Sequence, residues 1–223
     1  MKQKVRLLFG VLLLVANPFG LVASELEKSI SKSISKKLSK TVDKETQLSA
    51  WTFNDGNFQL ELIQRSPQQT RSFFQGRGFS SKVADDIALS CVFQTIGRNT
   101  EADNKTDSVT VDLSEWRLVL VDVKGNKSEN ENENAIEKPI KLKEDWAEQW
   151  KNSDIKPASR IAFRWATYPT VQSYDPGGDF NWGMISMGPK PEATFDLHIF
   201  WKQGEQQHDA WIRQMQCPAD QPE

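Results

Sequence analysis

The chain is poor in the residues that most often carry out chemistry. Its 223 residues include only two cysteines, two histidines and two tyrosines. It contains no Gly-x-Ser-x-Gly, His-Glu-x-x-His or Cys-x-x-Cys motif and no phosphate-binding loop, so the common hydrolase, zinc-protease, thiol-redox and nucleotide sites lack their local signatures. The sequence therefore favours a non-catalytic protein. An enzyme that acts on polysaccharides outside the cytoplasm remains open as a third hypothesis.

An excess of positive charge is also missing. Lysine and arginine number 28 against 30 aspartates and glutamates, and the net charge is -2. Binding to nucleic acid generally needs a clustered basic surface that neutralises phosphates. The composition therefore predicts no nucleic-acid partner.

Only one long apolar run is present, and it lies at the N-terminus. Lys2, Lys4 and Arg6 precede the run from Leu7 to Val15, and Ala23 offers a small residue at a cleavage site. This order is typical of a secretory signal peptide spanning residues 1–23, cleaved after Ala23. The alternative is an uncleaved membrane anchor, but the Asn, Pro and Gly residues within the segment argue against it. We expect a periplasmic or secreted protein.

Residues 24–50 lack aromatic side chains and are rich in lysine and serine. Apolar residues recur at every fourth position, and lysines recur at the same interval two positions later, which would place the two rows on opposite faces of a helix. One interpretation is a basic amphipathic helix that binds a protein or membrane-surface partner through residues 25–48. The other is a flexible stalk, because the intervening serines lower helix propensity.

The two cysteines, Cys91 and Cys217, both follow the signal segment. Export to an oxidising compartment favours a bond between them, although two separate thiols, one of them a metal ligand, are the alternative. The sequence predicts a disulfide between Cys91 and Cys217.

The sequence pattern of residues 51–223 predicts a single β-rich domain. Alternating apolar residues predict strands near 58–62, 109–113, 161–165, 194–201 and 207–215, and helical spacing predicts short helices after Ser80 and around Trp146. The Asn- and Glu-rich stretch 125–138 is predicted to be a disordered loop. The fold class expected is mainly β or α+β, an antiparallel β-sandwich-like domain with one or two inserted helices.

The densest group of unusual residues lies between Tyr174 and Met184. Asp175, Asp179 and Asn181 supply oxygen ligands, and Trp182 supplies a flat ring. The mixture suits a Ca²⁺ ion or a polyhydroxylated ligand, and the two aspartates could form the carboxylate pair of a glycosidase. The simpler interpretation is a turn, since Pro-Gly-Gly favours one.

A second candidate site is a copper centre. His198, Met184 and Met187 carry imidazole and thioether groups, which are ligands that copper accepts in exported proteins. The alternative is that they are ordinary core and surface residues.

The chain has eight tryptophans, and whether each is buried or exposed matters, because an exposed tryptophan can stack on a sugar or on a protein partner. Trp165 and Trp201 lie on alternating apolar rows and are predicted to be buried. Trp182, in a turn-rich stretch, is predicted to reach solvent. The leading hypothesis is thus an exported, non-catalytic accessory or binding protein, with a metal-handling protein as the alternative.

Overall fold

A computed structural model describes residues 37–102, 107–121 and 137–220. Its strands and helices are, in chain order, β1 (Leu38–Val42), β2 (Ser49–Asp55), β3 (Phe58–Gln64), α2 (Pro67–Gln75), α3 (Ser81–Ala88), β4 (Val92–Asn99), β5 (Val109–Asp112), the 3-10 turn η1 (Leu113–Glu115), β6 (Arg117–Val121), β7 (Lys138–Pro139), α4 (Lys143–Gln149), α5 (Pro157–Ala166), β8 (Val171–Tyr174), β9 (Phe180–Ser186), β10 (Thr194–Gln203) and β11 (Gln206–Gln216).

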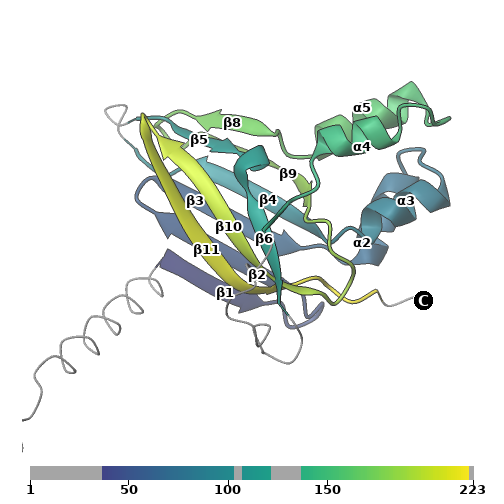
Figure 1. The fold of residues 1–223 in the computed structure, drawn as a ribbon, viewed down its shortest axis with the longest axis horizontal. Helices are drawn as coiled ribbons and strands as arrows, with labels where there is room; N and C mark the ends of the chain where they lie inside the picture. The colour runs from purple at the N-terminus through teal and green to yellow at the C-terminus, as the bar shows by residue number, and fades with distance from the viewer. Residues whose placement is uncertain (1–36, 103–106, 122–136, 221–223) are drawn as a thin grey trace, which may run out of the picture. The chain divides into compact units, whose positions relative to one another are not determined.

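The strands form two antiparallel sheets that pack face to face (Figure 1). Sheet A has the order β1-β2-β3-β4-β9, with β1 and β9 at its edges. In sheet B, β10 pairs along its length with β11, and with β6 and β5 at its two ends. The predicted β-sandwich-like α+β fold is confirmed.

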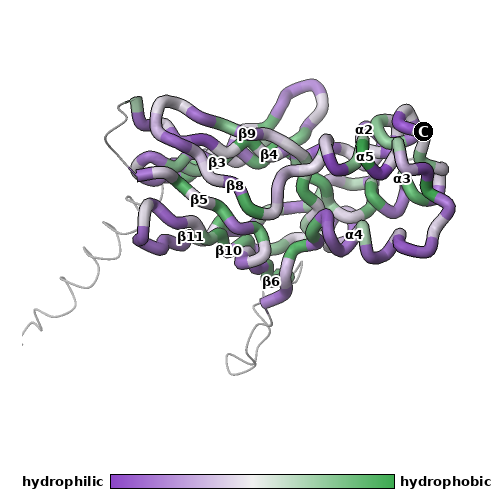
Figure 2. The backbone as a smooth tube through the Cα atoms, turned by 90° about the horizontal axis from the view of Figure 1, so that it is seen from above, coloured by the Kyte–Doolittle hydropathy of each residue, from purple (hydrophilic) through white to green (hydrophobic). Residues whose placement is uncertain are grey.

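The main core lies between the sheets. Side chains alternate along each strand, so that every second residue of β3 and of β10 is buried. Figure 2 shows hydrophobic and hydrophilic segments following one another along these strands. Trp201 lies in this core, as predicted.

A smaller core holds the four helices at one end of the sandwich (Figure 1). Trp146 and Trp150 of the α4 region pack there against Phe163 of α5. Val92 and Met184 join the cluster from β4 and β9, and so this end of the outer face of sheet A, the face turned away from sheet B, is covered.

One predicted boundary differs from the structure, at the start of the domain. The folded part begins before Trp51, because β1 lies inside the segment predicted to be a stalk or helix and pairs with β2. Leu38 packs against the main core, whereas Val42 is exposed. The signal segment and residues 24–36 lie outside the described residues.

Other differences concern single elements. Residues 161–165 are not a strand but part of α5, and Trp165 is 85% exposed rather than buried. The buried residues of this helix, Ser159, Phe163 and Ala166, follow the helical period. Of the loop predicted for 125–138, residues 122–136 lie outside the described residues, but Lys138 belongs to β7 and pairs with Leu118.

The predicted disulfide is confirmed, since the Cys91 and Cys217 sulfur atoms are 2.00 Å apart. Cys91 precedes β4 of sheet A, and Cys217 follows β11 of sheet B. The bond therefore joins the two layers.

None of the helices in the described ranges has the length and apolar character needed to span a bilayer.

Both tyrosines lie between the sheets, with their hydroxyls directed at Gly97 of β4. A Cβ atom on Gly97 would lie 2.4 Å from the Oη atoms of both Tyr168 and Tyr174, so only glycine fits here. Burial raises the pKa of Tyr168 above the ordinary phenol value of 10.0.

This raised pKa predicts a loss of stability in alkali. Above pH 10 the unfolded chain releases the Tyr168 proton while the folded chain retains it, so the free energy of unfolding falls as the pH rises. Between pH 9 and pH 11 the residue should account for a fall of about 1.4 kcal/mol. Urea unfolding at the two pH values should show a correspondingly smaller fall in Tyr168→Phe. Equal falls in both proteins would contradict the prediction.

Candidate ligand-binding face

Strand β9 displays two large aromatic side chains to solvent. Phe180 is 59% and Trp182 is 58% exposed, and they lie two residues apart on the same side of the strand. Gly183 is buried, and Met184, on the same side as the two aromatic residues, lies under the helices. The aromatic pair therefore stands where helical cover ends, and the prediction that Trp182 reaches solvent is confirmed.

The register of sheet A sets the neighbours of Trp182. Directly opposed residues of antiparallel strands project to the same side of the sheet. Trp182 opposes Ile96 of β4, which opposes Glu61 of β3, which opposes Thr52 of β2. One row across the sheet thus carries an aromatic ring, an aliphatic side chain, a carboxylate and a hydroxyl.

A second row begins at Phe180. It continues through Arg98 of β4 and Gln59 of β3 to Asn54 of β2. The Gln59 amide donates to the Asn54 carbonyl oxygen at 2.7 Å, and the Arg98 guanidinium lies 3.5 Å from the Glu61 carboxylate of the first row. The polar groups are therefore held in place by one another.

We call these two rows, with Ile63 and Gln94, the open face: Thr52, Asn54, Gln59, Glu61, Ile63, Gln94, Ile96, Arg98, Phe180 and Trp182. Each of these side chains is exposed or partly exposed. Apolar and aromatic surface combined with a few oriented polar groups is the usual composition of a binding site for a small ligand.

In the loop predicted to bind a ligand, polar groups form hydrogen bonds with other groups of the protein. Asp179 accepts from the Asp175 backbone N–H at 3.2 Å. Asn181 donates to the Gln172 side chain at 2.7 Å and accepts from the Trp182 backbone N–H at 2.8 Å. The Asp179 and Asn181 side chains thus help to hold the turn, whereas the Trp182 side chain is exposed. Within the described ranges, no three histidine, cysteine, aspartate or glutamate residues gather where they could hold a metal ion.

The three residues of the predicted copper site are not brought together. Met184 lies in the small core beneath the helices, and Met187 lies in the main core between the sheets. His198 projects from the outer face of sheet B, opposite Trp211. The three side chains therefore lie in three separate places, the core beneath the helices, the core between the sheets and the outer face of sheet B.

The imidazole ring of His198 is held by contacts with neighbouring side chains. Its ring stacks on Trp211 at 4.1 Å between centroids and contacts Phe200 at 4.2 Å. The Nε2 atom lies 2.8 Å from Asp209, and the Nδ1 atom lies 3.6 Å from Glu137. These contacts hold the imidazole of β10 against β11 and against Glu137, the residue before β7.

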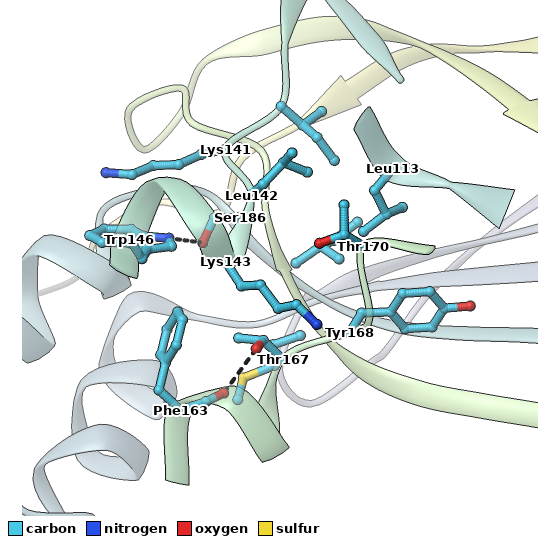
Figure 3. Close-up of a pocket in the computed structure, with 13 residues that line it drawn as sticks. Leu113, Lys141, Leu142, Lys143, Trp146, Phe163, Thr167, Tyr168, Thr170 and Ser186 are labelled. Atoms are coloured by element: carbon cyan, nitrogen blue, oxygen red, sulfur yellow. Dashed lines mark hydrogen bonds between the residues drawn. The ribbon is translucent and has the colours of Figure 1, made fainter. Parts of the chain in front are cut away.

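One small cavity lies between α4 and the 167–170 segment (Figure 3). Its volume is about 10 Å³, which is room for one water molecule. Trp146 donates to the Ser186 hydroxyl at 3.2 Å beside it. The Lys141 ammonium lies 3.3 Å from the Trp146 ring centroid, and burial lowers the pKa of Lys141. The cavity is too small for an organic ligand.

A larger cleft of about 310 Å³ lies beside the disulfide. The loop after β1, the start of α2 and the segment after β11 line it. Its polar side chains are amides and hydroxyls, and Glu192 supplies its one carboxylate. Glu192 is the one titratable side chain among the residues that line the cleft, and no aromatic ring lines it.

Comparison of the chain with protein-family models, curated proteins and solved structures gave no match.

Sequence reasoning missed the helix that borders the open face. Helix α2 places Phe73 beside Arg65 and Arg77. Its start carried a recognisable signal: Ser66 accepts from the Gln69 backbone, and the Gln69 side chain accepts from the Ser66 backbone. This capping box, followed by proline at the first helical position, could have located α2.

Proposed function

We propose that this protein is a non-catalytic, exported binding protein whose ligand is a glycan bound on the open face. The observation that carries the proposal is the exposed pair Phe180 and Trp182, placed side by side on β9 beside fixed polar groups. The two aromatic rings are exposed on the same side of the strand. When a ligand covers them, they lose contact with water, and this burial of apolar surface stabilises the complex.

The chemistry of the face suits a sugar chain. The C–H faces of a pyranose ring pack against aromatic rings, and its hydroxyls both donate and accept hydrogen bonds. Glu61 accepts, Arg98 donates, and Gln59 does both. All three project from the same side of the sheet as Trp182.

The backbone edge of β9 is less suited to a protein partner that would add a strand. The Trp182 N–H is already bonded to the Asn181 side chain, and the Met184 carbonyl accepts from the Tyr168 N–H. A strand added at this edge would have to displace both bonds. The face of the sheet is therefore the more favourable contact surface.

Export is supported by the basic and apolar pattern of residues 1–23 and by the disulfide, since such bonds persist in oxidising compartments. Glycans are abundant outside the cytoplasm. The compartment and the proposed ligand therefore agree.

The proposal is tested by retention on polysaccharides. The mature protein is applied to cellulose, chitin, peptidoglycan and soluble glycans in affinity electrophoresis. The double variant F180A/W182A should bind the retained glycan roughly tenfold or more weakly, because both stacking rings are lost. Since both side chains are more than half exposed, its free energy of unfolding should fall by less than about 2 kcal/mol.

Trp165→Ala is the matched control. Trp165 is more exposed than Trp182 but belongs to α5, outside the open face. Its removal should leave retention unchanged. Equal losses in W165A and in F180A/W182A, or a wild-type protein that no glycan retains, would refute the proposal.

A further inference from the structure

Two arginines lie against one phenylalanine at the border between the helices and the open face. The Arg77 guanidinium is 3.3 Å from the Phe73 ring centroid, and the Arg65 guanidinium is 5.6 Å from it. Arg77 also donates to the Phe73 carbonyl oxygen at 3.0 Å. Two positive groups are thus held around a single ring.

Neither arginine forms an ion pair within the described ranges, where other arginines such as Arg71 and Arg213 do. The Arg65 Nε atom is buried and has no hydrogen-bond partner among these residues. Burial, followed by the charge of Arg77, lowers the pKa of Arg65, although a guanidinium remains protonated at neutral pH. A half-buried cation beside a like charge is unfavourable, and an oxyanion within reach of both guanidiniums would relieve both costs.

The arginine pair stands on the same side of sheet A as Trp182. Arg65 follows Ile63 by two residues and donates its backbone N–H to Val92, whose side chain lies on this side beneath the helices. Val92 and Ile96, the neighbour of Trp182, are about 13 Å apart along β4, and Arg65 and Trp182 lie one strand to either side of β4, about 10 Å apart across the sheet, which places Arg65 roughly 16 Å from Trp182. A sugar chain of several residues bridges that distance.

We propose that Arg65 and Arg77 form an anion subsite, and that the glycan bound on the open face is acidic. This inference rests on the proposed function and names its substrate class. The guanidinium fork pairs with a carboxylate or a phosphate group through two parallel hydrogen bonds. Phe73 holds the Arg77 fork by stacking, while the neutral part of the chain reaches Phe180 and Trp182.

The test compares polymers that share a backbone and differ in charge. The pairs are polygalacturonate and its methyl ester, carboxymethyl and hydroxyethyl cellulose, and phosphorylated and plain dextran. Wild-type protein should bind the acidic member of at least one pair roughly tenfold more tightly at low salt, and the preference should shrink as salt is added. The first two pairs report a carboxylate ligand, and the third reports a phosphate.

R65Q/R77Q should lose this preference while still binding the neutral polymer. R77Q alone should reduce it, which guards against a folding defect caused by changing the half-buried Arg65. R164Q removes one positive charge, as R77Q does, from the exposed side of α5 and should leave the preference intact. The melting temperature of each variant is measured alongside.

The outcomes separate the two proposals. If wild-type protein binds both members of every pair equally, and F180A/W182A binds neither, the anion subsite is refuted and glycan binding stands. If R65Q/R77Q keeps the acidic preference, the subsite is likewise refuted. If wild-type protein binds none of the polymers, both proposals fail.

Discussion

Replacing Cys91 and Cys217 together with serine should lower the free energy of unfolding by about 4–5 kcal/mol. The disulfide joins residues 126 positions apart, and a cross-link that closes so long a loop removes much of the conformational freedom of the unfolded chain. Both half-cystines are almost fully buried, so the bond also fixes packed positions. In a domain of this size the melting temperature should drop by roughly 10–15 °C.

Chemical denaturation of the wild-type protein with and without reductant provides the control. Full reduction in denaturant, followed by refolding in reductant, should bring the wild-type midpoint to that of C91S/C217S, whose midpoint should not respond to reductant. Equal midpoints for the oxidised wild type and the double variant would show that the bond contributes nothing to stability.

The disulfide was predictable because the chain has only two cysteines and therefore one possible pair. The strands were predictable where apolar residues alternate, as in 58–62 and 194–201.

The wrong prediction of a strand at 161–165 has a clear physical origin. Ile161, Phe163 and Trp165 alternate as in a strand, but Phe163 and Ala166 also fit a helical face. Pro157, at the first helical position, favoured the helix. Trp165 then falls on the exposed side.

The candidate site was predictable only in part. A tryptophan beside glycine in a turn-rich segment indicated that Trp182 would be exposed. Its partners Ile96 and Glu61 could not be foreseen, because the pairing of β9 with β4 joins residues more than 80 positions apart and depends on the whole topology. In the adjacent loop, Asp179 accepts from the Asp175 backbone N–H and Asn181 donates to Gln172, and ligand binding by these residues stays a prediction.

Replacing Gly183 of β9 with alanine should strongly destabilise the protein. An added Cβ atom would lie 2.4 Å from the Tyr168 nitrogen, 2.6 Å from its Cα atom and 2.8 Å from the Thr167 carbonyl carbon. All three atoms are backbone, so no side-chain rotation relieves the clash. Moving the segment away would break the hydrogen bond from Tyr168 N–H to the Met184 carbonyl oxygen, 2.9 Å long.

We expect G183A to lose roughly 3 kcal/mol or more of unfolding free energy, at the upper end of the cost of overpacking, measured by urea denaturation. Gly76→Ala is the matched control, because Gly76 is exposed, has an ordinary helical φ of -61°, and leaves 3.4 Å between an added Cβ atom and the nearest backbone oxygen. Its stability should change by less than about 1 kcal/mol in either direction. Because Gly183 is the residue that lets the 167–168 backbone close against β9 beside Trp182, G183A should also weaken glycan retention, whereas G76A should not. A G183A protein as stable as the wild type would mean that this close approach of the two backbones is not what holds β9 in place.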